Sequence, residues 1–216
     1  MTGLMKTEGA MSTAQRKVME KKMRREAILS SARTVLIAKG FSSTTMQDVA
    51  DAAGLSVGTL YLYFRDKESI FVELYTEGMR ELEERITGAC GGIHSPEEKI
   101  EMMAMAYFRF HNEQRSLFDA FSYFFSFPEI LFKKPRRKAL ALRGRMILSL
   151  VQSAIEEGIK GKIFRKTDPQ REALVLWSSL HGILQVEKMR DVLFPEYGME
   201  DVYRYQVKKL IKGLLV

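Results

Sequence analysis

The chain has 216 residues and a formal net charge of +7, with 34 lysine and arginine residues against 27 aspartate and glutamate residues. Its hydrophobic content of 46% and aromatic content of 10% are those of a globular protein and exclude a disordered or collagen-like chain. The single cysteine, Cys90, cannot form an intramolecular disulfide bond. Since neither an apolar run of 18 residues nor a signal-peptide pattern occurs, we expect a soluble, cytoplasmic protein that makes no membrane contact.

The positive charge is concentrated near the N-terminus. Residues 1–67 hold 11 basic and 6 acidic side chains, whereas the remainder holds 23 and 21. Six cations lie within residues 16–25, opposed only by Glu20. We expect residues 1–21 to form a basic arm, whose charge is either solvated or bound to a polyanion. A second basic cluster at residues 133–145 is expected to be a solvated loop and helix face.

Apolar side chains recur with a helical period through most of the chain. The pattern predicts a long helix from about residue 67 to 90, followed by helices near 136–160, 169–191 and 199–214. Ser95 and Asp168 each precede a proline and are predicted N-caps. No Asn-Gly or Asp-Gly turn joins alternating segments, which argues against hairpins. We therefore predict an all-α fold with about nine helices.

Residues 44–67 predict two short helices joined by a tight turn. Thr44 and Gln47 have the spacing of a capping box, and Gly54 stands where a left-handed residue would end the first helix. Ser56 is then a suitable N-cap for the second helix. A plain corner in a helical bundle has a similar pattern, but the short second helix also suits entry into the major groove of DNA.

The second of these helices has two different faces. Leu60 and Phe64 lie four residues apart and are assigned to the core. Leu62 lies on the opposite face, where its methyl groups suit contact with a thymine methyl group. Lys67 follows Asp66, the predicted N-cap of the long helix. A positive charge at a helix N-terminus is unfavourable because it lies at the positive end of the helix dipole. A phosphate bound there would remove that conflict.

Residues 24–84 resemble the DNA-binding domain of the TetR/AcrR family of transcriptional regulators. The family pattern appears as Gly40-Phe41, Thr44-Thr45, Val49-Ala50, Ala53-Gly54-Leu55-Ser56, Gly58-Thr59-Leu60-Tyr61, Tyr63-Phe64 and Lys67-Glu68. The resemblance implies an N-terminal three-helix domain over 22–82, with its helix-turn-helix motif at 45–64. A helical ligand-binding and dimerisation domain would follow over 83–216.

The resemblance also implies the residues that face double-stranded operator DNA. Backbone-contacting positions would be Thr44, Thr45, Tyr61, Tyr63 and Lys67, and positions near base edges would be Gln47, Val57, Gly58 and Thr59. The chain departs from the commoner pattern at Val57 and Leu62, which lack hydrogen-bonding side chains. We therefore predict that thymine methyl contacts, including one from Leu62, carry part of the specificity.

Residues 107–127 hold nine of the 22 aromatic residues, more than one helix face buries. With the neighbouring methionines they predict an adaptable apolar cavity for a flat aromatic or acyl effector. His111 and His181 are candidate polar anchors, and a satisfied core histidine is the alternative for each. The predicted ligand-binding residues are Met103, Tyr107, Phe110, His111, Phe121, Phe124, Phe125, Trp177 and His181.

A homodimer is also implied by the resemblance, with the last two helices packing against a partner chain. Small residues on the 169–191 helix are compatible with such close packing, although a contact within one chain would have the same pattern. The predicted interface residues are Ser178, Ser179, Gly182, Val207, Leu210, Ile211 and Leu214.

An enzyme is not indicated by any motif. The three histidines lack metal-ligand spacing, and HExxH, G-x-S-x-G and Walker A patterns are missing, so we expect no catalytic residue, metal or cofactor. The leading prediction is a dimeric, ligand-responsive repressor that binds a near-palindromic operator and is released by a hydrophobic small molecule. The alternatives are a helical carrier or sensor of hydrophobic molecules without specific DNA binding, and a nucleoid-like DNA binder without an effector.

Overall fold

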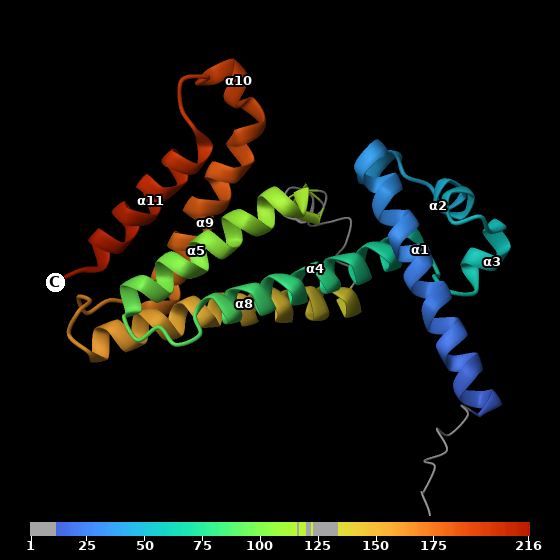
Figure 1. Ribbon diagram of the computed structural model, residues 1–216, viewed down its shortest axis with the longest axis horizontal. Coiled ribbons are helices and arrows are strands. Elements are labelled where there is room, and N and C mark those ends of the chain that lie inside the picture. Colours follow the sequence, from blue (N-terminus) through green and yellow to red (C-terminus); the bar gives the residue numbers. More distant parts are fainter. Residues whose placement is uncertain (1–11, 116, 120–121, 123–133) are drawn as a thin grey trace, which may run out of the picture. The chain divides into compact units, whose positions relative to one another are not determined.

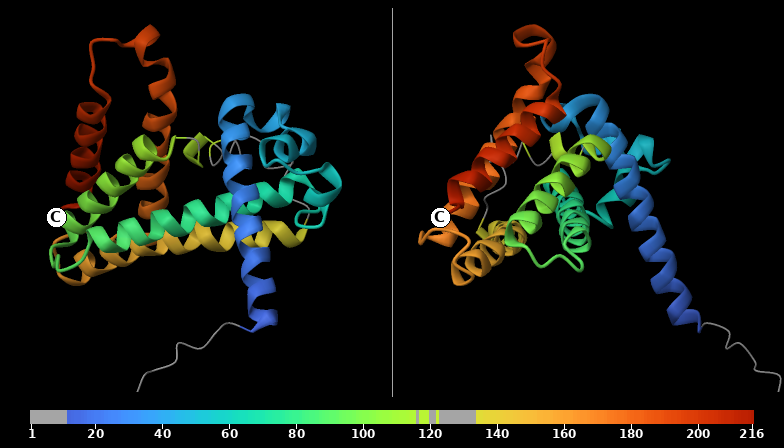
Figure 2. Two further views of the ribbon diagram at one scale, coloured as in Figure 1. Left: turned by 45° about the vertical axis from the view of Figure 1, so that its right-hand side comes forward. Right: turned by 60° about the vertical axis from the view of Figure 1, so that its left-hand side comes forward.

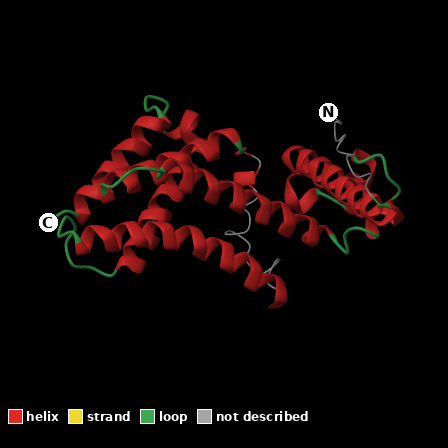
Figure 3. Ribbon diagram, turned by 60° about the horizontal axis from the view of Figure 1, so that its bottom comes forward, coloured by secondary structure: helices red, strands yellow, loops and turns green. Residues whose placement is uncertain are grey.

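The computed structural model describes residues 12–115, 117–119, 122 and 134–216. Within these ranges the protein has nine α-helices and one short 3-10 helix, and it has no β-strand beyond an isolated bridge between Phe164 and Leu215 (Figures 1 and 3). This confirms the predicted all-α class. In the described part of the chain, no helix has the length and apolarity needed to cross a membrane. Nor do three His, Cys, Asp or Glu side chains gather there in a way that would hold a metal ion.

The chain divides into two compact units, residues 1–70 and 71–216, and the division falls inside a helix, ahead of the predicted boundary at 82. The first unit contains α1 (Thr13–Ser43), α2 (Met46–Ala52), α3 (Val57–Tyr61) and the first turn of α4 (Lys67–Ala89). The bounds of α4 confirm the predicted long helix. Because α4 starts in one unit and continues in the other, no linker separates them.

Helix α1 is longer than the predicted domain. Its N-cap is Ser12, whose hydroxyl accepts from the backbone N–H of Gln15 while the Gln15 side chain accepts from the N–H of Ser12. Residues 13–21 of the predicted basic arm therefore belong to a helix. Gly40, with φ of 71°, kinks the other end of α1, as glycine does without steric cost. The buried side chains of α1 are Ile28, Leu29, Ala32, Val35 and Phe41.

The described part of the second unit contains the rest of α4 and six further elements. These are α5 (Pro96–Glu113), α8 (Lys134–Lys160), α9 (Pro169–Val186), η1 (Glu187–Met189), α10 (Arg190–Leu193) and α11 (Met199–Leu214). Ser95 and Asp168 accept hydrogen bonds from the first backbone N–H groups of α5 and α9, as predicted. The helix predicted over 169–191 ends at Val186, where the chain continues as η1 and α10.

The core of the second unit lies between α5, α8, α9 and α11. Helix α8 packs against α5 and α9, and α11 packs against the same two helices. Helices α4 and α8 run side by side in both views (Figure 2), and Arg143 of α8 reaches Glu83 of α4. Tyr203 of α11 is fully buried and donates its hydroxyl hydrogen to the carbonyl oxygen of Ala104, at 2.9 Å. This bond fixes which side of α11 faces the interior.

Candidate nucleic-acid interface

Helix α2 begins one residue later than the predicted capping box implies. Thr45 is the N-cap, since its hydroxyl accepts from the N–H of Asp48 and the Asp48 carboxylate accepts from the N–H of Thr45. Thr44 is only 1% exposed, and its hydroxyl donates to the carbonyl oxygen of Gly40 at 2.7 Å. The predicted contact between the Thr44 side chain and DNA is therefore wrong, because that side chain is buried and already bonded.

Asp48 ties the end of α1 to the start of α2. Lys39 Nζ lies 2.7 Å from its carboxylate, and the hydroxyl of Thr45 lies 2.8 Å away. The hydrogen bond from Lys39, followed by those from Thr45, lowers the pKa of Asp48 to about 2. Gln47, a predicted base reader, is exposed and donates its amide hydrogen to Asp51 at 2.7 Å. The α2 surface is thus ordered by charged hydrogen bonds at neutral pH.

The turn and α3 follow the predicted design. Gly54 has φ of 64°, which ends α2 in the left-handed region. Ser56 caps α3 by accepting from the N–H of Thr59 at 3.1 Å, and its hydroxyl also bonds that of Thr59 at 2.8 Å. Leu60 and Phe64 are 0% and 2% exposed, which confirms the core face.

The opposite face of α3 is open. Leu62 is 78% exposed and Tyr61 52% exposed, and Gly58 is also exposed. The other predicted contact residues of this segment, Val57, Thr59 and Tyr63, are half-buried. A short helix that buries one face and presents apolar, glycine and hydroxyl groups on the other has the form needed to enter a major groove.

Lys67 bonds the end of α1 and the start of α2. Asp66 is the N-cap of α4, since its carboxylate accepts from the N–H of Ser69 at 2.8 Å. The ammonium group of Lys67 donates to three carbonyl oxygens at the end of α1 and the start of α2, those of Phe41 (3.2 Å), Ser42 (3.3 Å) and Thr44 (3.0 Å). Its three hydrogens are thereby used within the protein. In the absence of DNA this side chain therefore has a structural role, and its predicted phosphate contact stays a prediction.

The predicted ligand-binding residues that the structure describes come from α5 and α9. Tyr107 Oη lies 2.7 Å from His181 Nδ1, and the ring of Trp177 stacks on that of His181 with 5.1 Å between centroids. Met103, Phe110 and His111 are buried on α5, whereas Trp177 and His181 are half-buried. Phe121, Phe124 and Phe125, which were also predicted, lie outside the described residues.

His181 is a neutral group in this core. Burial, followed by the nearby His111, lowers the pKa of His181 to about 4. Gln185 Nε2 lies 3.3 Å from His181 Nε2 and also bonds the hydroxyl of Ser122. Since the amide nitrogen donates, Nε2 of His181 accepts and Nδ1 carries the proton that reaches Tyr107. Gln185 was missed from the sequence, although its position four residues after His181 was a usable signal.

His111 is fully buried beside a carboxylate. Its Nε2 lies 3.3 Å from Glu187 Oε2, and Arg115 pairs with the same carboxylate at 2.8 Å. Burial lowers the pKa of His111, against the opposing effects of Asn112 and Glu187. The rings of Phe118 and His111 pack edge to face, with 4.4 Å between their centroids. Glu187 was also missed, because nothing in the local sequence relates it to a residue 76 positions earlier.

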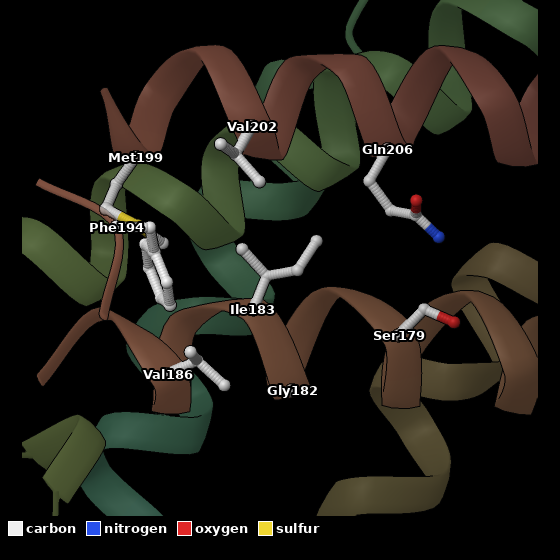
Figure 4. Close-up of a pocket in the computed structure, with 8 residues that line it drawn as sticks. All are labelled: Ser179, Gly182, Ile183, Val186, Phe194, Met199, Val202 and Gln206. Carbon is white, nitrogen blue, oxygen red and sulfur yellow. The ribbon is translucent and has the colours of Figure 1, made fainter. Parts of the chain in front are cut away.

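A groove of about 420 Å³ runs between α9 and α11 (Figure 4). Two predicted interface residues, Ser179 and Gly182, line it, and Ser178 is exposed beside them. Leu210 and Ile211 are half-buried. Val207 and Leu214 are only 2% and 3% exposed. Their assignment to a dimer interface is wrong, because they pack inside the protomer on the same side of α11 as Tyr203.

Comparison with known proteins agrees with this architecture. Residues 28–74 match the model of the bacterial regulatory proteins of the tetR family. The HTH-type transcriptional regulator YhgD of Bacillus subtilis is 26% identical over 180 residues, which cover 79% of this chain and 92% of that protein. The HTH-type transcriptional repressor KstR2 of Mycolicibacterium smegmatis is 34% identical over 85 residues, or 39% of this chain and 42% of the repressor.

A solved structure shares the fold of both units. The transcriptional regulator FadR from Bacillus subtilis, in complex with stearoyl-CoA, has a TM-score of 0.70 at 20% identity, covering 88% of this chain and 98% of FadR. At that identity the likeness establishes the fold. The relatives are regulators rather than enzymes, and the helix-turn-helix has the predicted form. Residues 28–74, with their helix-turn-helix, are thus similar to the bacterial regulatory proteins of the tetR family.

Proposed function

We propose that this protein is a ligand-responsive repressor that binds a near-palindromic operator as a homodimer and is released by a hydrophobic small molecule. The observation that carries this proposal is the contrast between Leu60 in α3, which is fully buried, and Leu62 at the C-cap of α3, which is 78% exposed. Exposure of a leucine side chain to water is unfavourable. In a major groove the same side chain is removed from water and packs against thymine methyl groups. The match of residues 28–74 to the tetR family and the relative named as a repressor support the same conclusion.

The proposed DNA contacts lie on one continuous segment. Gln47 and the exposed side of α3 would meet base edges, and the hydroxyl groups of Thr45, Tyr61 and Tyr63 would meet the sugar-phosphate backbone. Thr44 and Lys67 are left out, because their polar atoms are bonded inside the unit. Since the target is chromosomal DNA, we propose that the protein works in the cytoplasm.

The proposed effector site lies in the core between α5 and α9. Tyr107, His181 and Trp177 form a polar point within apolar surroundings, the arrangement typical of small-molecule sites. Because His181 is neutral, this point suits an uncharged acceptor or donor such as a thioester carbonyl better than an ionised carboxylate. FadR, which shares the fold, was solved with stearoyl-CoA, so an acyl-CoA is the first effector to test.

Helix α4 is the proposed connection between effector and DNA. Arg85 of α4 bonds Glu113 at the end of α5, with 2.5 Å between Nη1 and Oε2. Arg143 of α8 reaches Glu83 of α4 at 3.5 Å. An effector that displaces α5 would therefore move α4, whose first turn belongs to the DNA-binding unit. Operator affinity falls only insofar as the effector prefers the displaced state.

The proposed homodimer interface is the outer face of α9 with the adjoining groove. Ser179, Gly182 and Val186 line the groove, and Val186 is 43% exposed. Val192 and Leu193, which are 78% and 59% exposed, precede Phe194, which also lines the groove. Exposed apolar residues that gather around a groove indicate a protein contact. A second copy would also place two α3 helices on one duplex, as a near-palindromic operator requires.

The test is selection of duplexes from a random library by the purified protein, followed by fluorescence anisotropy with and without a long-chain acyl-CoA. We expect a near-palindromic duplex bound with a Kd of about 10⁻⁸ M or below, and weaker binding with the acyl-CoA. Failure to enrich any duplex, together with tight acyl-CoA binding, would instead support the carrier alternative. Acyl-CoA binding that leaves operator affinity unchanged would contradict the proposed coupling.

A further inference from the structure

The N-terminal part of α1 extends beyond the three-helix unit. The N-terminal end of α1 runs past α2 and α3 (Figures 1 and 2). Residues 13–24 are exposed, whereas the buried stripe of α1 begins only at Ile28. At 1.5 Å per residue, these twelve residues form a projection about 18 Å long. We call residues 13–24 the α1 extension.

The α1 extension is built to remain helical. The reciprocal bonds of Ser12 and Gln15, at 2.8 and 3.2 Å, satisfy two of the backbone N–H groups that a helix start leaves open. Lys22 and Glu26 add an ion pair one turn apart, at 3.8 Å. Because the extension continues directly into the packed part of α1, its direction is fixed by that packing.

Three cations share one side of the α1 extension. Lys17, Lys21 and Arg24 are exposed and form no ion pair with any residue that the structure describes. At about 100° per residue their directions fall within about 60° of one another. Ile28 and Val35 lie in the same sector further along the helix and are buried in the unit. We call these three cations the α1 basic face. They therefore point to the side of α1 that, further along the helix, packs against the rest of the unit.

The α1 basic face begins next to the end of α3. Arg25 donates from Nη1 to the carbonyl oxygen of Tyr63 at 2.7 Å, and its guanidinium group lies 4.1 Å from the centre of the Phe64 ring. Tyr63 follows α3 by two residues. This anchor places the last residues of the extension, next to Arg24, beside the proposed DNA surface.

We propose that the α1 basic face binds the phosphates of the duplex flanking the base pairs that α3 contacts. This proposal rests on the proposed operator binding and adds a second contact to it. Duplex DNA carries one charge per about 1.7 Å of axis, so a projection of about 18 Å spans about five base pairs of closely spaced phosphates. Exposed like charges on a rigid helix repel one another, and a polyanion relieves that repulsion.

The test replaces all three cations in the full-length protein, as Lys17→Gln, Lys21→Gln and Arg24→Gln. Glutamine keeps the helix propensity, and all three positions are exposed, so the fold is expected to persist. The matched control removes the same charge from exposed positions of the second unit, as Lys160→Gln, Lys162→Gln and Lys166→Gln. Both variants are measured on the duplex that wild-type protein selects, extended by ten flanking base pairs on each side.

We expect the slope of log affinity against log NaCl concentration to become shallower by about 2.7 for each extension in contact with DNA. Between 50 and 200 mM NaCl, one such contact means that wild-type protein loses about 40-fold more affinity than the variant. The control variant keeps the wild-type slope. On a duplex trimmed to the base pairs protected by the helix-turn-helix, the difference between wild type and variant disappears.

The outcomes separate this proposal from the function it rests on. If wild-type protein selects no duplex, the proposed function itself fails. If it does, and all proteins show one salt slope, operator binding stands and the α1 basic face has no phosphate contact. The proposal would also be overturned if the salt slopes were equal and the α1 variant lost binding to phosphatidylserine vesicles. The α1 basic face would then contact a membrane surface.

Discussion

The ammonium nitrogen of Lys67 lies 3.0 Å from the carbonyl oxygen of Thr44, so the first residue of α4 holds the corner between α1 and α2. The carbonyl oxygens of Phe41 and Ser42 complete this contact. The start of the helix-turn-helix is thus bonded to the helix that continues into the second unit. We expect displacement of α4 to reach the DNA-binding helices through this cation.

Replacing this cation tests its structural role. Lys67→Gln is expected to lower the free energy of unfolding by about 1–3 kcal/mol, because three carbonyl oxygens lose a charged donor. Urea unfolding measures this change. The neighbouring exposed cation provides the control, since Arg65→Gln is expected to leave stability within about 0.5 kcal/mol of wild type. Unchanged stability with weakened DNA binding in Lys67→Gln would restore the phosphate contact.

Leu62 is expected to matter for DNA and not for the fold. Leu62→Ala removes a side chain that is 78% exposed, so the free energy of unfolding changes by less than about 0.5 kcal/mol. Loss of a thymine methyl contact worth about 1 kcal/mol lowers affinity about fivefold for each half-site, or about 30-fold for the dimer on its operator. Replacing thymine by uracil in the selected duplex weakens the binding of wild-type protein more than that of the variant. Leu142→Ala, at a leucine of α8 that is 58% exposed, is the control for both measurements.

Two glycines of the helix-turn-helix are expected to respond in opposite ways to alanine. Gly54 has φ of 64°, so Gly54→Ala costs about 1–2 kcal/mol of stability although its methyl group meets no neighbour. Gly58 lies inside α3, where an added methyl group would have its nearest neighbour 3.9 Å away, so Gly58→Ala stabilises the helix by about 0.5–1 kcal/mol. Thermal unfolding distinguishes the two. An operator affinity unchanged in Gly58→Ala would count against base-edge contact at this position.

Acid is expected to destabilise the protein partly through His181. Its pKa of about 4 in the fold lies below the ordinary 6.5, so the neutral form contributes stability above pH 6.5 that is lost as pH falls toward 4. Between pH 7 and 4.5 the loss is about 2 kcal/mol, after allowance for partial exposure. His181→Gln removes this part of the pH dependence in urea unfolding, whereas His94→Gln, at an exposed histidine, keeps it. An unaltered pH dependence in His181→Gln would contradict the assigned environment.

The α9 face is expected to hold the dimer together. Gly182→Trp places an indole ring at a helix position that has open space around it, so the protomer is expected to fold. The ring blocks the close approach of a second copy, and the native mass is expected to shift from dimer to monomer. Leu214→Ala acts inside the protomer instead, lowering the free energy of unfolding by about 2–4 kcal/mol because its side chain is 3% exposed. A dimer that persists in Gly182→Trp would place the interface elsewhere.

Local signals in the sequence were sufficient for much of the fold. Ser95, Asp168 and Ser56 each act as the predicted cap, because a cap depends on its own hydroxyl or carboxylate and the next three residues. Thr44 and Thr45 are adjacent hydroxyls with equal local capacity to cap α2. The choice between them follows from Gly40, whose kink brings its carbonyl oxygen within 2.7 Å of the Thr44 hydroxyl.

The remaining errors concern partners that lie far apart in the chain. Periodicity identified an apolar stripe on the last helix but not whether it meets its own chain or a second copy. Val207 and Leu214 turn inward because Tyr203 bonds Ala104, 99 residues earlier. The contacts of Lys67 within the chain were missed for the same reason, since its carbonyl partners lie 23 to 26 residues away.

Helix α3 has only five residues, too few to be stable by itself. Its helical conformation depends on the N-cap Ser56 and on the burial of Leu60 in the core of the first unit. We call these inward residues the scaffold. The outward positions Gly58, Tyr61 and Leu62 contribute little to the folding free energy. Operator preference can therefore drift through single substitutions on this face while the scaffold stays intact, so related regulators with the same fold are free to diverge in the genes they control.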